Sequence, residues 1–298
     1  MLVPLSSDCD PLPPMNFTQQ LTRAETLNDS LLCVGLDPDP AKFPGSWKDD
    51  PSRIFDFCAT IVDATKDLVI AFKPQIAYFA AQRAEDQLER LIAHIHGVAP
   101  EVPVILDAKR GDIGSTAEQY AHEVFERYRA DAVTLSPFMG FDSIEPYLRH
   151  EGKGAILLCR TSNPGGADLQ GQRLGSGDTL FEHIARLAQG EWNASGQLAL
   201  VVGATYPAEI ERVRALAPTL PLLIPGIGAQ GGDAVATVHA GWRADASGRT
   251  VAPIIVSSSR AVLYASRGDN FAAAARRAAL ATRLELNEAR RNRAGAAN

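Results

Sequence analysis

Short runs of aliphatic, often β-branched residues recur along this chain, and segments with helical spacing lie between them. Strands that are apolar throughout and alternate with helices indicate a parallel sheet covered by helices. Eight such units predict an α/β fold, a (β/α)₈ TIM barrel, with an open, doubly wound sheet as the alternative. The eight runs are 31–37, 68–73, 103–109, 132–135, 154–160, 198–203, 221–226 and 253–258.

The domain organisation follows from length and from the absence of a break. A chain of 298 residues suits either one large barrel or two ordinary domains. No long Pro/Ser-rich linker separates the first predicted strand from the last, so we expect a single barrel domain over residues 1–298. An extra helix is predicted at 17–29, before the first strand. The ends, about 1–15 and 288–298, are expected to be poorly ordered because they lack an apolar face.

Charge and cysteine usage exclude several classes of protein. The net charge of −6 and the pI near 5.6 argue against sequence-independent binding of nucleic acid, which requires a basic surface. The four cysteines lie far apart and the six histidines are scattered, so neither a zinc site nor a disulfide framework is indicated. We find no signal peptide and no run of 18 apolar residues, and we expect a cytoplasmic protein that does not span a membrane.

Polar residues stand at the carboxyl ends of most of the predicted strands. In a barrel these ends, with the loops that follow them, form the active site on one face. They are therefore the candidate site residues. They comprise Asp37 at the end of the first strand, Lys73 at the end of the second, Asp107 and Lys109 at the end of the third, Ser162 after the fifth, Gln230 after the seventh and Arg260 after the eighth.

The third strand carries the densest charge. Side chains two residues apart share one face of a strand, so Asp107 and Lys109 should meet inside the barrel mouth while Leu106 faces the helices. An ion pair with a purely structural role is the alternative for these two residues. Asp37 and Lys73 on neighbouring strands weaken that alternative, because burying several charges together is costly.

The segment after the third strand is predicted to turn into a helix. The sequence S-x-x-E at 115–118 has the form of a capping box, with Ser115 as the N-cap and Glu118 reaching back to it. Residues 110–114 would then form a short loop that carries Asp112. This places a third charged side chain near the barrel mouth.

Two glycine-rich segments indicate binding loops. Residues 226–231 satisfy the dinucleotide-binding pattern G-x-G-x-x-G. They follow the seventh strand, however, and the eighth strand ends without the acidic residue that would hold a ribose. A phosphate site therefore fits this segment better than a dinucleotide site. Arg260 would offer a guanidinium for bidentate contact with phosphate, with a surface salt bridge as the alternative. The long stretch 161–177 is expected to be a lid or binding loop, or else a mobile surface loop.

The run 107-DAKRGDIGST-116 resembles the D-x-K-x-x-D-I signature of orotidine 5′-phosphate decarboxylases, in the form of their longer bacterial branch. Further similar segments lie before and after this run, in the family's order, so the resemblance covers nearly the whole chain. The D-x-K element alone is less specific, since sugar-phosphate decarboxylases and hexulose-phosphate synthases share it. The further segments are 34–39, 72–79, 161–166, 226–233 and 256–262.

This resemblance implies decarboxylation of orotidine 5′-phosphate to uridine 5′-phosphate in pyrimidine synthesis, without a cofactor or metal. It implies that Lys109 is the proton donor, with Asp107 as its partner near the departing carboxylate. It also implies a homodimer in which Asp112 is contributed to the neighbouring subunit's site. The implied substrate contacts are Asp37 and Lys73 at the ribose, Ser162 at the pyrimidine, and Gln230 and Arg260 at the phosphate. Thr116 is a further implied substrate-binding residue, and Lys73 also joins the charged network. The chain departs from the family at Ser259, where many members have glycine.

The chemistry of this reaction explains why a lysine is needed. Loss of carbon dioxide leaves a carbanion in the plane of the pyrimidine ring, which the π system cannot delocalise, so a cation and an acid must be held at that carbon. Lys109 suits both tasks, and flanking carboxylates favour its ammonium form. Two alternatives remain: a metal-dependent sugar-phosphate decarboxylase or aldolase of the same barrel superfamily, and a non-catalytic barrel that binds a phosphate ligand.

Overall fold

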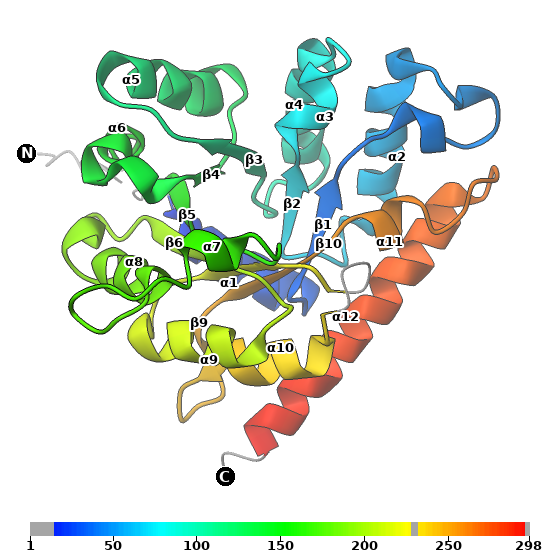
Figure 1. The fold of residues 1–298 in the computed structure, drawn as a ribbon. Coiled ribbons are helices and arrows are strands. Elements are labelled where there is room, and N and C mark those ends of the chain that lie inside the picture. The colour runs from blue at the N-terminus through cyan, green and yellow to red at the C-terminus, as the bar shows by residue number, and fades with distance from the viewer. Residues whose placement is uncertain (1–14, 228–231, 296–298) are drawn as a thin grey trace, which may run out of the picture.

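The computed structural model describes residues 15–227 and 232–295, and a barrel of parallel strands lies at its centre (Figure 1). The strand order is β2-β1-β10-β7-β6-β5-β4-β3. Bridges Phe72↔Val104 and Gln75↔Asp107 join β2 to β3 and close the ring. The predicted TIM barrel is thus confirmed. Its strands are β1 (Leu32–Leu36), β2 (Ala71–Pro74), β3 (Ile105–Arg110), β4 (Ala132–Leu135), β5 (Gly154–Arg160), β6 (Leu198–Val202), β7 (Leu222–Pro225) and β10 (Ile254–Ser258).

Helices surround the barrel and connect its strands. The predicted segment 76–97 is divided, because residues 81–84 form a turn in which Arg83 has a φ of 52°. A π-helical turn, Glu123–Arg127, extends α5, and a hairpin of β8 (Arg243–Ala244) and β9 (Thr250–Ala252) precedes the last barrel strand. The α-helices are α1 (Phe17–Asn28), α2 (Ile54–Thr65), α3 (Ile76–Ala80), α4 (Glu85–Val98), α5 (Gly114–His122), α6 (Glu145–Leu148), α7 (Gly166–Leu169), α8 (Leu180–Gln189), α9 (Pro207–Leu216), α10 (Ala234–Gly241), α11 (Arg260–Leu263) and α12 (Phe271–Gly295).

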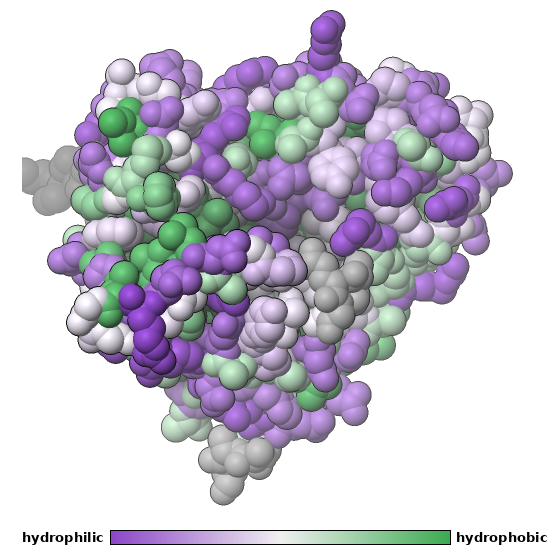
Figure 2. Space-filling model, in the orientation of Figure 1, coloured by the Kyte–Doolittle hydropathy of each residue, from purple (hydrophilic) through white to green (hydrophobic). Residues whose placement is uncertain are grey.

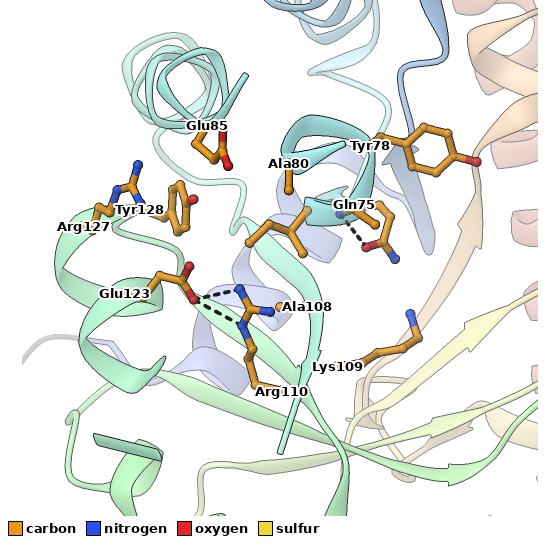
Figure 3. Close-up of a pocket in the computed structure, with 12 residues that line it drawn as sticks. Gln75, Tyr78, Ala80, Glu85, Ala108, Lys109, Arg110, Glu123, Arg127 and Tyr128 are labelled. Atoms are coloured by element: carbon orange, nitrogen blue, oxygen red, sulfur yellow. Dashed lines mark hydrogen bonds and ion pairs between the residues drawn. The ribbon is translucent and has the colours of Figure 1, made fainter. Parts of the chain in front are cut away.

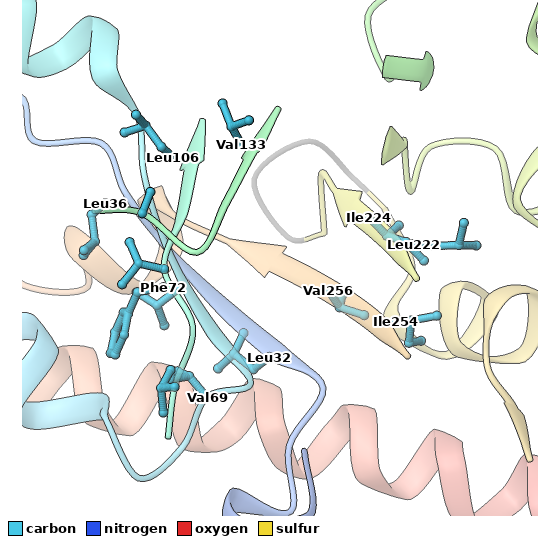
Figure 4. Packing of buried hydrophobic residues seen from close by; sticks show 14 of the residues in the cluster. Leu32, Leu36, Val69, Phe72, Leu106, Val133, Leu222, Ile224, Ile254 and Val256 are labelled. Atoms are coloured by element: carbon cyan, nitrogen blue, oxygen red, sulfur yellow. The ribbon is translucent and has the colours of Figure 1, made fainter. Parts of the chain in front are cut away.

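Alternation along the strands divides the apolar core into two layers. On β3, Ile105 belongs to the cluster inside the barrel. Leu106, and Val104 just before the strand, belong to the larger cluster between strands and helices, of which Figure 4 shows Leu106 and its neighbours. This is the division that a period of two residues predicts. The side chains of α1 complete the inner cluster, and a Cβ at Gly154 would lie 2.4 Å from the Phe17 ring, so glycine is required there.

The predicted capping box at the start of α5 is wrong. The helix begins at Gly114 with Ile113 as its N-cap, and no side chain within 15–227 and 232–295 caps it. Ser115 already lies inside the first turn, where its hydroxyl cannot serve as an N-cap. Glu118 instead pairs with Arg149, at 2.7 Å between Oε1 and Nη1.

The expectation of a poorly ordered tail from residue 288 is also wrong for residues 288–295, which continue α12. Polar contacts to the end of α1 hold this part of the helix. Asn287 donates to the backbone oxygen of Asp29 at 2.7 Å, and Arg290 pairs with both Asp29 and Glu25. These contacts join segments that are distant in the chain, so they do not produce an apolar face in the local sequence. Residues 1–14 and 296–298, on which the rest of this expectation falls, lie outside the described residues.

None of the helices within residues 15–227 and 232–295 combines the length and the apolar composition that crossing a membrane requires.

Candidate active site

Three charged side chains form a continuous chain at the ends of β2 and β3. Lys73 Nζ lies 2.8 Å from Asp107 Oδ2, and Lys109 Nζ lies 2.6 Å from Asp107 Oδ1. Thr134 on β4 donates its hydroxyl to Asp107 Oδ1 at 3.0 Å. The predicted contact between Asp107 and Lys109 is present. The carboxylate is fixed between two ammonium groups and a hydroxyl.

The backbone of β3 is irregular where these charges stand. Its register with β4 shifts between Leu106 and Arg110, and Lys109 has a φ of 47°, in the left-handed region. The Thr134 hydroxyl oxygen accepts hydrogen bonds from the backbone N–H of Ala108 and of Lys109, at 3.1 and 3.0 Å. A bulge of this kind re-aims a side chain near an active site. Sequence reasoning missed Thr134, although a single hydroxyl in the apolar strand 132-AVTL-135 is a usable signal.

Burial and charge act in opposite directions on this group of residues. Burial alone would raise the pKa of Asp107, but Lys73 and Lys109 outweigh it and hold the pKa well below its usual range. Burial alone would lower the pKa of Lys73, but Asp107 and Asp37 outweigh it and raise the pKa. The relative exposures are only 6% for Lys73 and 8% for Asp107. The site therefore keeps a buried carboxylate and a buried ammonium charged at neutral pH.

A cavity of about 590 Å³ opens over these residues at the carboxyl ends of the strands. This volume lies within the range of small-molecule sites, about 300–1,000 Å³. Leu158, Val201 and Leu223 contribute apolar surface. Six residues predicted from the sequence line it together, although they come from distant parts of the chain. They are Asp37, Lys73, Asp107, Lys109, Ser162 and Arg260.

Two further predicted residues, Asp112 and Thr116, lie outside this cavity. Asp112 is half-buried in the loop before α5, where its Oδ1 accepts a hydrogen bond from the backbone N–H of Ile113 at 2.8 Å. Thr116 is exposed on α5. Neither residue lines the cavity. Gln230 lies outside the described residues.

A second cavity of about 610 Å³ lies beside the first and shares Lys109 with it (Figure 3). Within it Arg110 donates from Nε and Nη2 to Glu123 Oε2, at 3.1 and 2.8 Å, and Tyr128 and Glu85 also line it. Arg110 points toward Glu123, whereas Lys109 points away from that pair. Lys109 thus borders a hollow on either side of β3, and the sequence contained no signal for the second one.

Comparison with known proteins identifies the family to which this chain is similar. A model of the orotidine 5′-phosphate decarboxylase / HUMPS family matches residues 30–277. A protein of Leptothrix cholodnii named orotidine 5′-phosphate decarboxylase is 77% identical over 278 residues, which are 92% of this chain and 98% of that protein. One of the same name from Methylibium petroleiphilum is 75% identical over 93% of this chain and 100% of that protein.

A solved structure shares the fold as well as the sequence. The structure of Leishmania donovani OMP decarboxylase superposes with a TM-score of 0.79 and is 38% identical, covering 93% of this chain and 99% of that chain. The resemblance inferred from 107-DAKRGDIGST-116 is therefore confirmed: the chain belongs to the orotidine 5′-phosphate decarboxylase / HUMPS family.

Proposed function

We infer that this protein decarboxylates orotidine 5′-phosphate, producing uridine 5′-phosphate and carbon dioxide in pyrimidine synthesis. The observation that carries this inference is the carboxylate of Asp107, fixed between the ammonium groups of Lys73 and Lys109 at one end of a nucleotide-sized cavity. The names of the close relatives agree with this reaction. The decarboxylation requires an acid at one ring carbon and fixed charges around that acid. The side chains of Lys109, Asp107 and Lys73 supply both.

In the proposed mechanism Lys109 protonates the ring. As the carboxylate leaves as carbon dioxide, its bonding electron pair stays on the ring carbon, and Lys109 transfers a proton from Nζ to that carbon. The neutral amine then regains a proton from solvent. A positioned general acid typically contributes about 10²–10⁴-fold, whereas enzymes lower barriers by about 8–23 kcal/mol in total. Fixed electrostatics must therefore supply much of the remainder.

Asp107 and Lys73 provide that fixed environment. The Asp107 carboxylate holds the Lys109 ammonium at 2.6 Å, and Lys73 balances its charge from the other side at 2.8 Å. Because these groups are oriented before the substrate binds, they need no reorganisation when charge develops on the ring. We assign to both residues the role of orienting and stabilising the acid.

The remaining cavity residues are proposed to hold the substrate. We assign Asp37 and Lys73 to the ribose, Ser162 to the pyrimidine and Arg260 to the phosphate. All of them line the same cavity, which supports these assignments. Part of the 161–177 segment, including α7, lines it too, and we propose that this segment closes over bound substrate. Binding energy from the phosphate can drive such a closure.

We further propose that the active protein is a homodimer, in which Asp112 and Thr116 of one subunit complete the site of the other. Both residues lie outside their own subunit's cavity. Large apolar side chains are exposed on the loops and α7 after β3, β4 and β5, and hydrophobic surface gathers beside α7 (Figure 2). Apolar surface of this kind marks association sites. These side chains are Ile113, Phe138, Met139, Phe141 and Leu169, and the exposure of Phe138 reaches 75%.

Location and domain organisation complete the proposal. We propose a cytoplasmic location, which the free and buried thiols of Cys33, Cys58 and Cys159 support, because a reducing compartment preserves such thiols. We also propose that the whole chain, 1–298, forms one domain, since a single barrel sheet runs through the described residues.

The proposed function predicts turnover that depends on Lys109 and not on metal. Wild-type protein should reduce the absorbance of orotidine 5′-phosphate at an undiminished rate in the presence of a chelator. Lys109→Ala should lose nearly all of kcat, by at least about 10²-fold, because the proton donor is removed. The matched control is Lys48→Ala, which removes an exposed ammonium away from the cavity and should leave kcat unchanged.

Other outcomes would favour the alternatives. Activity that survives Lys109→Ala would contradict the assignment of the acid. Loss of wild-type activity in chelator would favour a metal-dependent decarboxylase or aldolase. Tight binding of uridine 5′-phosphate by calorimetry, without any turnover, would favour a non-catalytic phosphate-binding barrel.

A further inference from the structure

Asp37, at the end of β1, is held from two sides by the segment that follows β10. Ser259 donates its hydroxyl to Asp37 Oδ2 at 2.7 Å. Tyr264 donates its hydroxyl to the Asp37 backbone oxygen at 2.8 Å and accepts a hydrogen bond from the Asp39 N–H at 2.7 Å. Both the side chain and the backbone of Asp37 are therefore fixed by residues more than 200 positions away in the sequence.

The second oxygen of this carboxylate has no such partner. Asp37 Oδ1 is buried and accepts no hydrogen bond from any residue within 15–227 and 232–295. Leaving a buried acceptor without a donor is costly, and the cost is larger for a charged group. Asp37 also lines the cavity of about 590 Å³. A ligand hydroxyl is the kind of group that would satisfy this oxygen.

The backbone of β1 allows Ser259 to approach this closely. A Cβ at Gly35 would lie 2.8 Å from Ser259 Cβ, so any other residue at position 35 would displace the serine. Ser259 packs against the strand at this point and directs its hydroxyl to Asp37, two residues further along. The contact thus depends on a glycine in one strand and a serine after another.

We propose that Ser259 is a positioning residue for substrate binding: its hydroxyl fixes Asp37 so that Oδ1 accepts a hydrogen bond from a ribose hydroxyl of the nucleotide. The inference rests on the proposed function, because it takes the ligand to be a ribonucleotide. The Ser259 hydroxyl is engaged by Asp37 Oδ2 and acts through that carboxylate. A direct contact of Ser259 with the ligand is the competing role, since Ser259 also lines the cavity.

The test compares Ser259→Ala with wild type in turnover and in product binding. We expect KM for orotidine 5′-phosphate and Ki for uridine 5′-phosphate to rise about tenfold, with kcat nearly unchanged, because one hydrogen bond to a charged group is lost on the binding side. Ser266→Ala removes another serine hydroxyl after the same strand, one that contacts Asn270 at 2.7 Å, and should leave all three constants unchanged. Thermal unfolding confirms that each variant is folded.

Analogues and a second substitution separate the two roles. The two analogues are 2′-deoxy- and 3′-deoxyuridine 5′-phosphate, each of which lacks one ribose hydroxyl. If Ser259 acts through Asp37, the analogue that lacks the hydroxyl bound by Asp37 should have the same Ki in wild type and in Ser259→Ala. Ser259→Ala should also have no further effect in an Asp37→Ala background, because the carboxylate that it positions is gone.

Three results would overturn the positioning role while leaving the decarboxylase intact: an unchanged KM and Ki in Ser259→Ala, an equal rise in Ki for both deoxy analogues, or a full additional loss in the Asp37→Ala background. Absence of wild-type turnover would instead overturn the proposed function. Dissociation constants for uridine 5′-phosphate and its analogues, measured by calorimetry, would still decide the role of Ser259, since they do not depend on turnover.

Discussion

At the scale of single residues, Asp107 is the group on which the charged site depends. It is 8% exposed and contacts Lys73, Lys109 and Thr134. A buried ion pair is weak evidence for stability by itself, but removal of one partner leaves an uncompensated buried charge and costs about 3–5 kcal/mol. The Lys73 ammonium would be left in that position if the carboxylate were removed.

We expect Asp107→Asn to lower the free energy of unfolding by about 3 kcal/mol at pH 7, measured by urea denaturation at fixed protein concentration. The pKa of Asp107 is lowered in the folded protein from an unfolded value of about 3.9. The folded state therefore binds fewer protons than the unfolded state between these two values. The stabilisation by the carboxylate is complete above the unfolded pKa and is lost as the pH falls toward the folded pKa.

The difference between wild type and Asp107→Asn should accordingly be constant from pH 5 to 8 and should shrink below about pH 4. Asp86→Asn, which alters an exposed carboxylate on α4, is the control and should change stability by no more than about 0.5 kcal/mol. A difference that stays constant down to pH 3 would contradict the lowered pKa of Asp107.

At the scale of elements, the last turns of α12 are held by the end of α1. Glu25 on α1 is 5% exposed, and its carboxylate contacts Thr250 on β9 and Arg290 on α12. Burial raises the pKa of Glu25, although Thr250 and Arg290 oppose that rise. Three elements that are distant in sequence therefore depend on one buried carboxylate.

Arg290→Ala should lower the free energy of unfolding by about 2 kcal/mol at pH 7, because hydrogen bonds to a charged group are lost. The substitution raises the pKa of Glu25 further, so the folded state binds a proton at a higher pH than before. The loss should be largest at neutral pH and smaller near pH 4, where Glu25 is protonated in both proteins. Thermal and urea unfolding across this range measure it.

The neighbouring Arg291, which is exposed on the same helix, supplies the matched control for this experiment. Arg291→Ala should change stability by no more than about 0.5 kcal/mol. Equal losses in the two variants would show that the contact with Glu25 does not hold the end of α12.

At the scale of the whole molecule, the proposed dimer determines whether one subunit can work alone. In a symmetric dimer, Asp112 of each subunit would complete the active site of the other subunit. The active-site motif 107–116 would then serve two sites, with Asp107 and Lys109 in one and Asp112 and Thr116 in the other.

Mixing inactive subunits tests this arrangement. Lys109→Ala and Asp112→Ala proteins should each be nearly inactive alone. After subunit exchange the mixture should recover about one quarter of wild-type activity, because half of randomly paired dimers are heterodimers and each has one intact site. Exchange is verified by isolating dimers that carry two different affinity tags. No recovery in verified heterodimers would contradict shared sites.

Much of this protein follows from local spacing in the sequence. The period of two residues along the strands predicted which side of the barrel Ile105, Leu106 and Asp107 face, and the structure confirms it. Alternation of strands and helices predicted the barrel. The ends of the strands then indicated six residues that line one cavity, because parallel strands bring their carboxyl ends to the same face. Local sequence patterns predict which residues lie together wherever the direction of the strands alone determines it.

Contacts between distant segments required the tertiary structure. Thr134 stabilises the bulge that aims Lys109, Ser259 holds Asp37 across 222 positions, and Arg290 reaches Glu25 across 265. No local period encodes these pairs, because they form only after the barrel closes and α1 and α12 pack beside each other. The sequence by itself determined the fold and which charged residues meet at its mouth. Tertiary packing decided how each one is oriented, because a side chain's direction depends on partners brought near only by folding.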